Sequence, residues 1–198
     1  EAFANCSNLT NISIPNSIIY IGNNAFRGCN NIKYNEYNNG KYLGNESNQY
    51  LVLADVIDTS VSEFSISDSC QIIYGYAFSG CSILTEITLP SSLTSIGNYA
   101  FSYCTGLTEI TLPASVTSID EYAFQSCTSL ATVTFAEGSQ LESIGNSAFI
   151  NCSSLTEITL PASLTNIGRQ VFFNSSGSIE IHYQGTMDQW LNMTFGSS

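Results

Sequence analysis

Cysteines are the most conspicuous residues with chemical potential in this 198-residue chain, which contains seven of them. Thiolates bind zinc or form disulfides, and zinc sites usually draw their ligands from closely spaced pairs. Six of the cysteines are instead 23 or more residues apart: Cys6, Cys29, Cys81, Cys104, Cys127 and Cys152. The seventh, Cys70, stands where related segments have Leu93 or Val116. Because free cysteine behaves as a small apolar residue, we predict a buried row of unpaired thiols. An occasional disulfide between neighbouring segments is the alternative.

His182 is the single histidine of the chain, and the sequence contains no Gly-x-Ser-x-Gly motif with a nucleophilic serine. The sequence therefore does not indicate a catalytic triad, and a structural or solvent-facing role for His182 is the simpler interpretation. Phosphate-binding glycine loops, H-E-x-x-H helices and calcium loops are also missing from the sequence. We therefore predict that the chain is not an enzyme and uses no cofactor, with no catalytic and no metal-binding residue.

The net charge of the chain limits the kinds of molecule that it can bind. Sixteen acidic residues stand against four basic ones, a formal net charge of -12. Nucleic acids are bound through Lys and Arg, so this composition excludes them, and it disfavours anionic membrane surfaces. No stretch approaches the ~18 consecutive apolar residues of a transmembrane helix, so we expect no membrane insertion within this segment.

The elements that position these residues repeat along the chain. An Ala-Phe pair precedes each of the six regularly spaced cysteines by three residues, and the pairs begin at residues 2, 25, 77, 100, 123 and 148. Val171-Phe172 is a degenerate seventh copy. Most successive copies are 23 residues apart, and one gap of 52 holds an extra unit plus an insertion. So short a unit cannot bury its own apolar face, which predicts stacked coils with one continuous core.

One coil is read most easily between residues 107 and 127. The segment 107–112, Leu-x-x-Ile-x-Leu, predicts a strand that Pro113 ends, and 116–119 predicts a second short strand. Ala-Phe-x-x-Cys then predicts a helical or 3₁₀ turn. We expect equivalent strands to pair in parallel as one long sheet. A glycine follows the second strand in four copies and suits a turn with positive φ: Gly22, Gly97, Gly145 and Gly168.

The pattern L-x-x-I-x-L-P-x-x-V-x-x-I-G-x-x-A-F-x-x-C resembles the BspA-like, or treponemal-type, leucine-rich repeats over residues 1–31 and 61–178. The resemblance implies a mainly β, right-handed solenoid with short helical turns, parallel strands and about seven coils. It also implies a surface-exposed or secreted protein of host-associated bacteria or parasitic protozoa, often credited with adhesion.

Two regions depart from the unit. Residues 32–60 form an irregular repeat, in which strands around a polar turn at 45–48 predict an inserted hairpin near 41–54. Residues 179–198 predict a C-terminal cap: Thr186 and Gln189 have capping-box spacing, and Met187, Trp190 and Leu191 should cover the last coil. We expect one solenoid domain over 1–198. Because Glu1 begins inside a repeat, we expect a fragment of a longer surface protein.

The strand positions that point away from the core are the candidate binding residues. They form two ladders, headed by Asn11 and Ser13: Glu86, Glu109, Thr132 and Glu157, and then Thr88, Thr111, Thr134 and Thr159. Concave strand faces of solenoids commonly bind partners, although such residues also simply solubilise an exposed strand. Tyr76, Tyr99 and Tyr122 form another ladder, either an exposed aromatic stripe or packing between coils.

The sequence thus favours an extracellular or cell-surface protein that binds a protein or glycan ligand, possibly on a host surface, through the Glu and Thr ladders. The location follows from the family resemblance alone. A passive structural spacer, or an arm that recruits substrate for a domain outside this segment, is the alternative.

Overall fold

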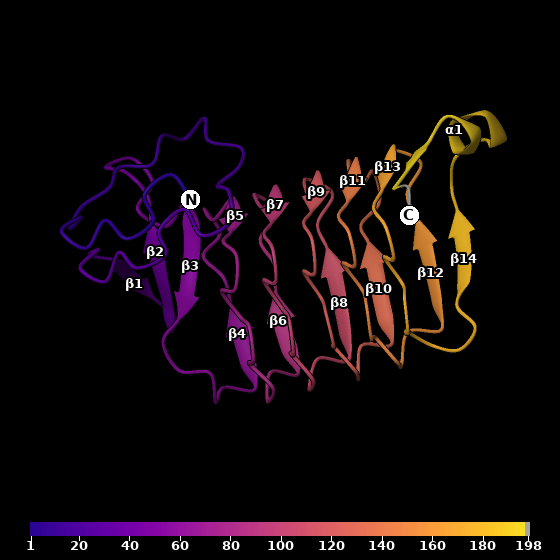
Figure 1. The fold of residues 1–198 in the computed structure, drawn as a ribbon, viewed down its shortest axis with the longest axis horizontal. Coiled ribbons are helices and arrows are strands. Elements are labelled where there is room, and N and C mark those ends of the chain that lie inside the picture. The colour runs from indigo at the N-terminus through magenta and orange to yellow at the C-terminus, as the bar shows by residue number, and fades with distance from the viewer. Residues whose placement is uncertain (197–198) are drawn as a thin grey trace.

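Short apolar units at a fixed spacing bury their faces only against one another, and in a computed structural model that describes residues 1–196 they do so. The coils stack side by side into an elongated solenoid, with strands running across its long axis (Figure 1). The predicted mainly β solenoid with parallel strands is confirmed.

The Leu-x-x-Ile-x-Leu segments form the first strand row. Its members are β4 (Glu63–Ser65), β6 (Glu86–Thr88), β8 (Glu109–Leu112), β10 (Thr132–Phe135), β12 (Glu157–Leu160) and β14 (Glu180–Tyr183). They pair in parallel but only two by two, as β4–β6, β8–β10 and β12–β14. The expected single long sheet is therefore not built from this row.

The continuous sheet is built from the second segment of each coil, the second strand row. Its members are β5 (Ile72–Ile73), β7 (Ser95–Ile96), β9 (Ser118–Ile119), β11 (Ser143–Ile144) and β13 (Asn166–Ile167). A glycine directly follows β7, β11 and β13, and it lets the backbones of successive coils approach closely. A Cβ on Gly145 would lie 2.5 Å from the Glu121 nitrogen, and one on Gly168 would lie 2.5 Å from the Asn146 nitrogen. Glycine is needed here for close approach of backbones, and the predicted positive φ at these glycines is wrong.

Positive φ falls instead within the third segment, Ala-Phe-x-x-Cys, which we call the turn row. The residue before Ala has φ of 68° at Tyr76 and 57° at both Tyr99 and Tyr122. These left-handed residues prevent the predicted helical turn, and linked turns form instead. Alternate N–H groups bond across to the next coil, for example Phe78 N to Ala100 O (2.8 Å).

The core is a set of ladders that run along the solenoid. Phe78, Phe101, Phe124 and Phe149 stack with ring centroids 4.9–5.1 Å apart and planes within 6° of parallel. Beside them, the Sγ atoms of Cys29, Cys104, Cys127 and Cys152 donate to the Phe carbonyl of the preceding coil, as in Cys127 to Phe101 (3.0 Å). All seven cysteines are free and all but Cys6 are buried, which confirms the predicted row of unpaired thiols. Burial raises the pKa of the Cys152 thiol to about 12.

The N-terminal region lacks this regularity. Its first strands are β1 (Asn35–Tyr37), β2 (Gly40–Leu43) and β3 (Val52–Val56), which pair antiparallel in that order. The predicted hairpin is confirmed and gains a third strand. β3 also pairs in parallel with β5, so the insertion joins the continuous sheet, which has nine strands in all between β1 and β15 (Thr194–Phe195).

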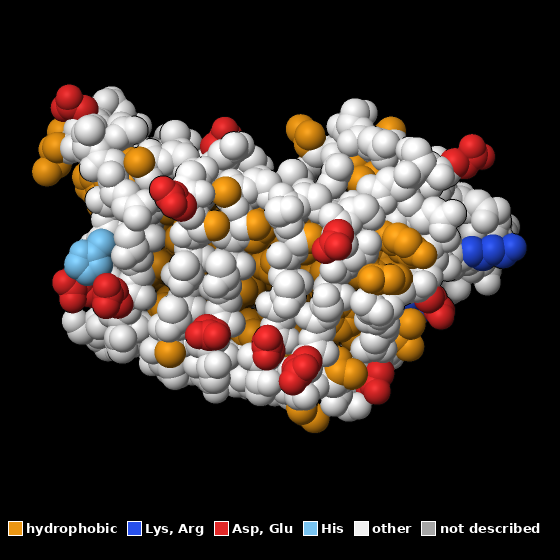
Figure 2. Space-filling view, turned by 180° about the vertical axis from the view of Figure 1, so that it is seen from behind, with side chains coloured by type: hydrophobic (Ala, Val, Ile, Leu, Met, Phe, Trp, Pro, Cys, Tyr) orange, Lys and Arg blue, Asp and Glu red, His pale blue; other side chains and the backbone are white. Residues whose placement is uncertain are grey.

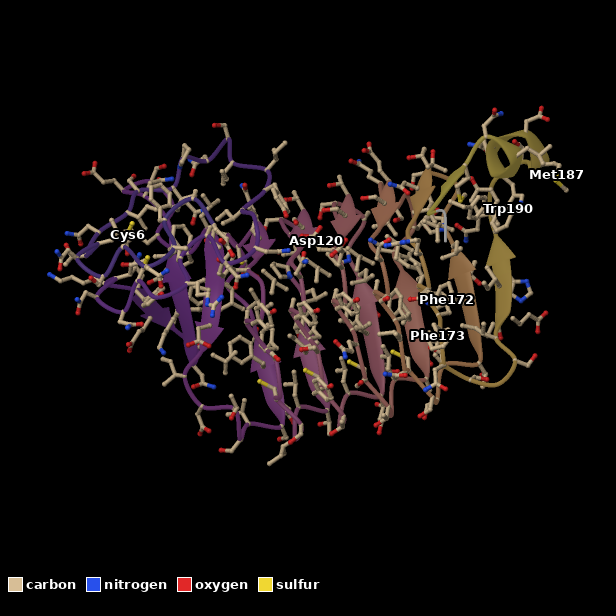
Figure 3. All side chains as sticks on the ribbon, in the orientation of Figure 1. Cys6, Asp120, Phe172, Phe173, Met187 and Trp190 are labelled. Atoms are coloured by element: carbon tan, nitrogen blue, oxygen red, sulfur yellow. The ribbon has the colours of Figure 1, made fainter. Side chains whose placement is uncertain are left out.

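The C-terminal helix α1 (Met187–Leu191) has the predicted capping box, in which Thr186 Oγ1 accepts from the Gln189 N–H (3.2 Å). The predicted lid is wrong in part, because Met187 and Leu191 are 71% and 72% exposed. The five-residue helix lies beyond β14 at one edge of the solenoid (Figures 1 and 3). Only Trp190 turns back, with its ring 5.3 Å from Phe195 of β15. Residues 197–198 of the predicted cap lie outside the described part.

Candidate functional site

The candidate site is the outward face of the first strand row. A strand turns alternate side chains to opposite sides, so Ile110 of β8 and Ile158 of β12 enter the core and their neighbours face outward. All eight predicted ladder residues are exposed on this face: Glu86, Glu109, Thr132, Glu157, Thr88, Thr111, Thr134 and Thr159. Within each strand pair, equivalent ladder residues lie in register beside each other, as Glu109 does beside Thr132. Asn11 and Ser13 precede the first strand and add no rung.

Two further glutamates extend the ladder. Glu63 pairs in register with Glu86, and Glu180 with Glu157. The five glutamates, which we call the acidic row, are Glu63, Glu86, Glu109, Glu157 and Glu180. Sequence reasoning missed the two end members because their repeats are degenerate, although each is 23 residues from a recognised rung. Figure 2 shows acidic side chains spread along this face, with the histidine at one end.

His182 lies at that end of the acidic row. Its Nε2 is 3.5 Å from Glu157 Oε1 and 3.3 Å from Glu180 Oε1. Within residues 1–196 no Lys or Arg side chain forms an ion pair with the row, because the basic residue found in an ion pair, Lys41, bonds Asp55. The acidic row therefore presents negative charge with a single titratable neighbour at one end.

The breaks in strand pairing open two grooves across the same face. One of about 630 Å³ lies between β10 and β12, lined by residues 131–135 and 156–159 with Gln184. A second of about 370 Å³ lies between β6 and β8 and includes Glu86 and Glu109. The facing strand edges are not bonded to each other in a ladder, but they lie too close together for a further strand to enter between them.

The ladder of Tyr76, Tyr99 and Tyr122 packs between coils and is also partly exposed. Tyr99 stacks on Tyr76 and on Tyr122, with centroids 4.9 and 4.7 Å apart and planes 7° from parallel. Tyr76 at the end of the stack is 48% exposed, while the other two are half-buried. The ladder is thus packing between coils and a partly exposed aromatic stripe at once.

The described residues contain no cluster of three or more His, Cys, Asp or Glu arranged to hold a metal ion. Among residues 1–196, no helix has the length and apolar character needed to cross a bilayer.

Stacked coils, a polar strand face and phenylalanine and cysteine ladders together define a leucine-rich-repeat solenoid. The profile described as "BspA type Leucine rich repeat region" matches residues 1–50 and 57–195 in six copies. The chain therefore belongs to the BspA-type leucine-rich-repeat family, as the repeat pattern predicted.

Solved structures give the same fold. The chain is similar to a leucine-rich-repeat protein of T. pallidum (22% identity, 83% of this chain, 86% of that chain, TM-score 0.62). It is also similar to a leucine-rich-repeat protein of Bacteroides ovatus (26% identity, 99% of this chain, 51% of that chain, TM-score 0.57). A third is the pneumococcal vaccine antigen PcpA (28% identity, 71% of this chain, 35% of that chain, TM-score 0.57). A search of curated proteins gave no match.

Proposed function

We propose that this chain is a non-catalytic binding module outside the cell, and that its acidic row binds a basic segment of a partner protein. The observation that carries the proposal is the alignment of five exposed glutamates on one strand face, without a Lys or Arg partner in the described chain. Like charges in a row raise the local concentration of cationic ligands and speed their association.

The grooves beside the row supply the second component of binding. A ligand that lies across β6 and β8 meets the Glu86 and Glu109 side chains and the groove between the two strands. Thr132 interrupts the row, so we expect two acidic patches, one on each side of it, and not one long track. Exposed ion pairs are each worth only ~0.2–1 kcal/mol, so several must act together.

The extracellular location is part of the proposal and is supported by family membership. One similar protein is known as a pneumococcal vaccine antigen, which is consistent with exposure outside the cell. We also propose that residues 1–198 act as one domain, since one sheet includes β1 near one end and β15 at the other.

A matched pair of double variants tests the binding face. Glu86→Thr/Glu109→Thr installs the residue that Thr132 already places in this ladder, and Glu137→Thr/Glu142→Thr removes the same charge from exposed positions outside it. With a lysine octapeptide as probe at low salt, we expect the first variant to bind about 3- to 10-fold more weakly and the second to bind like the parent. The affinity should also fall as salt rises.

Equal affinities for the two variants would contradict the proposed face. Absence of any binding by the parent protein at millimolar probe would instead favour the passive spacer, in which Glu and Thr only keep the strands solvated.

A further inference from the structure

A groove of about 560 Å³ lies on the opposite edge of the molecule from the acidic row, against the second strand row. Tyr20 and Asn23 of the N-terminal loop line one part of it, and Asp120, Glu121 and Asn146 line another. The space-filling view shows this edge hollowed between the N-terminal loop and the C-terminal segment (Figure 2). We call it the Asp120 groove.

Asp120 breaks the repeat at this groove. Its N–H bonds to Ile96 O, just as the N–H of Gly97, Gly145 and Gly168 bonds to the equivalent Ile carbonyl of the preceding coil. Glycine fills this close-packed column in those three coils, and Tyr74 fills it in the coil of β5, where its N–H bonds to Leu53 O. Asp120 is therefore the one charged side chain in this column between β5 and β13, and its carboxylate lies beside the sheet (Figure 3).

The carboxylate is not neutralised by the protein. The residue is half-buried, and its enclosed Oδ2 has no hydrogen-bond partner among the described residues. An unpaired buried charge costs folding free energy, so it is an expensive residue to hold for structure alone. Burial, with the neighbouring charge of Glu121, raises the pKa of Asp120 to about 6. At neutral pH the group still carries its charge for most of the time.

The surroundings reinforce the negative field. Glu121 Oε1 accepts from Asn146 Nδ2 (2.8 Å), which fixes a second carboxylate in the groove. Asn146 Oδ1 in turn accepts from the Arg169 backbone N–H (2.8 Å), so the amide is held from both sides. Burial, Asp120 and Glu121 together raise the pKa of Tyr20 across the groove. Lys and Arg side chains are missing from the lining.

We propose that the Asp120 groove binds the guanidinium group of an arginine side chain on a protein partner. A planar cation with five N–H donors offsets the uncompensated carboxylate, and the ring of Tyr20 offers a face for stacking. Anions are repelled by the two carboxylates. A neutral sugar leaves the charge uncompensated, and the described residues do not gather three acidic, His or Cys ligands for a metal ion. The site stands apart from the acidic row and does not depend on it.

The test uses N-acetyl-arginine methylamide and its citrulline counterpart, which has the same shape without the charge. Amide chemical shifts of the intact protein are followed at pH 7.5 and low salt. We expect saturable shifts around Gly97, Gly145 and Gly168 with the arginine probe, and at least a 10-fold weaker response to the citrulline probe.

Two variants test whether the arginine probe binds at the Asp120 groove. Asp120→Gly installs the residue of the neighbouring coils and should weaken arginine binding at least 10-fold while the fold is kept. Glu142→Gln removes one charge outside the groove and should bind like the parent. Equal binding by Asp120→Gly and the parent overturns the proposal, as does no saturable binding up to ~10 mM. Calcium binding that displaces the arginine probe would reassign the groove to a metal cation. Because neither variant touches the acidic row, the outcome is separate from that of the octapeptide experiment.

Discussion

The same Ala-Phe-x-x-Cys motif behaves differently in two regions of the solenoid. In the regular coils Phe101, Phe124 and Cys104 are completely buried. In the first coil Phe3 is 43% exposed and Cys6 is exposed, although Phe3 still stacks on Phe26 with centroids 5.9 Å apart. The motif therefore does not bury itself. Burial is conferred by stacked neighbours, and among the described residues Phe3 has one such ring, Phe26.

At the insertion, a different aromatic ring takes the next place in the phenylalanine ladder. The coil of Phe26 has no stacked Phe on its other side. Tyr74 takes that place instead, with its ring 5.7 Å from the Phe26 ring and its Oη accepting from the Phe26 N–H (3.3 Å). A second cluster of buried residues forms here, which includes Ile14, Ile32 and Leu51. The N-terminal region is thus a separately packed section of one stack.

The largest expected difference between the two regions is in stability. Phe101→Ala removes a ring that is packed on both faces, and should lower the free energy of unfolding by ~3–5 kcal/mol. Phe3→Ala removes a half-exposed ring and should cost less than ~1 kcal/mol. Urea titration of both variants measures this, and similar losses would show that the end coil is as tightly packed as the centre.

Thiol reactivity should separate the regions next. Burial holds the pKa of Cys104 far above its usual range and that of Cys152 at about 12, so little thiolate forms at pH 8. We expect a thiol reagent to modify Cys6 at least ~100-fold faster than these buried residues. Cys6→Ser should abolish the fast phase, while all the remaining thiols react after denaturation. Several fast thiols in the native protein would contradict the buried ladder.

A smaller effect, on the pH dependence of stability, is expected at Asp120 in the regular region. Asp120 has a folded-state pKa of about 6 against an ordinary 3.8, so the folded state retains the proton over a range in which the unfolded chain has lost it. Its contribution to stability is therefore favourable below about pH 4 and is lost as the pH rises to about 6.

Asp120→Asn should remove that loss. Allowing for partial screening in the open groove, we expect the variant to be ~1–2 kcal/mol more stable than the parent above pH 6 and equal to it below about pH 4. Glu142→Gln should change stability by less than ~0.5 kcal/mol at either pH. Thermal unfolding across pH 3.5–7.5 distinguishes these outcomes, and a pH-independent gain would mean that Asp120 is not the titrating group.

Periodicity predicted the core and the outward ladders because both depend only on the residue's place within a coil. The Phe and Cys positions and the eight exposed Glu and Thr residues follow directly from that place, whereas the hairpin follows from the break in the pattern at residues 32–60. The left-handed tyrosines did not, because tyrosine does not favour positive φ and only the bonds to the next coil hold it there. The interrupted pairing of the first strand row is likewise a property of neighbouring coils, which no single repeat reveals.

Asp120 was the site that a sequence comparison between repeats could have found. Four copies have a glycine after the second strand, whereas the coils of β5 and β9 have Tyr74 and Asp120 there. Tyr74 lies beside the inserted hairpin, but Asp120 lies within the regular coils. The helix α1 was misplaced for a different reason: its apolar residues suggested a lid, but β15 continues the sheet and already covers the end of β13.

The hydrogen bonds between coils have an electrical consequence. In the turn row the N–H groups point toward the C-terminal coil, as in Phe101 N to Ala123 O. At the ends of the second strands they point the other way, as in Gly145 N to Ile119 O. Because parallel strands exchange hydrogen bonds in both directions, the peptide dipoles of the solenoid do not all add along its axis, unlike those of an α-helix. Further coils can therefore be stacked without forming a macrodipole that grows with the length of the solenoid.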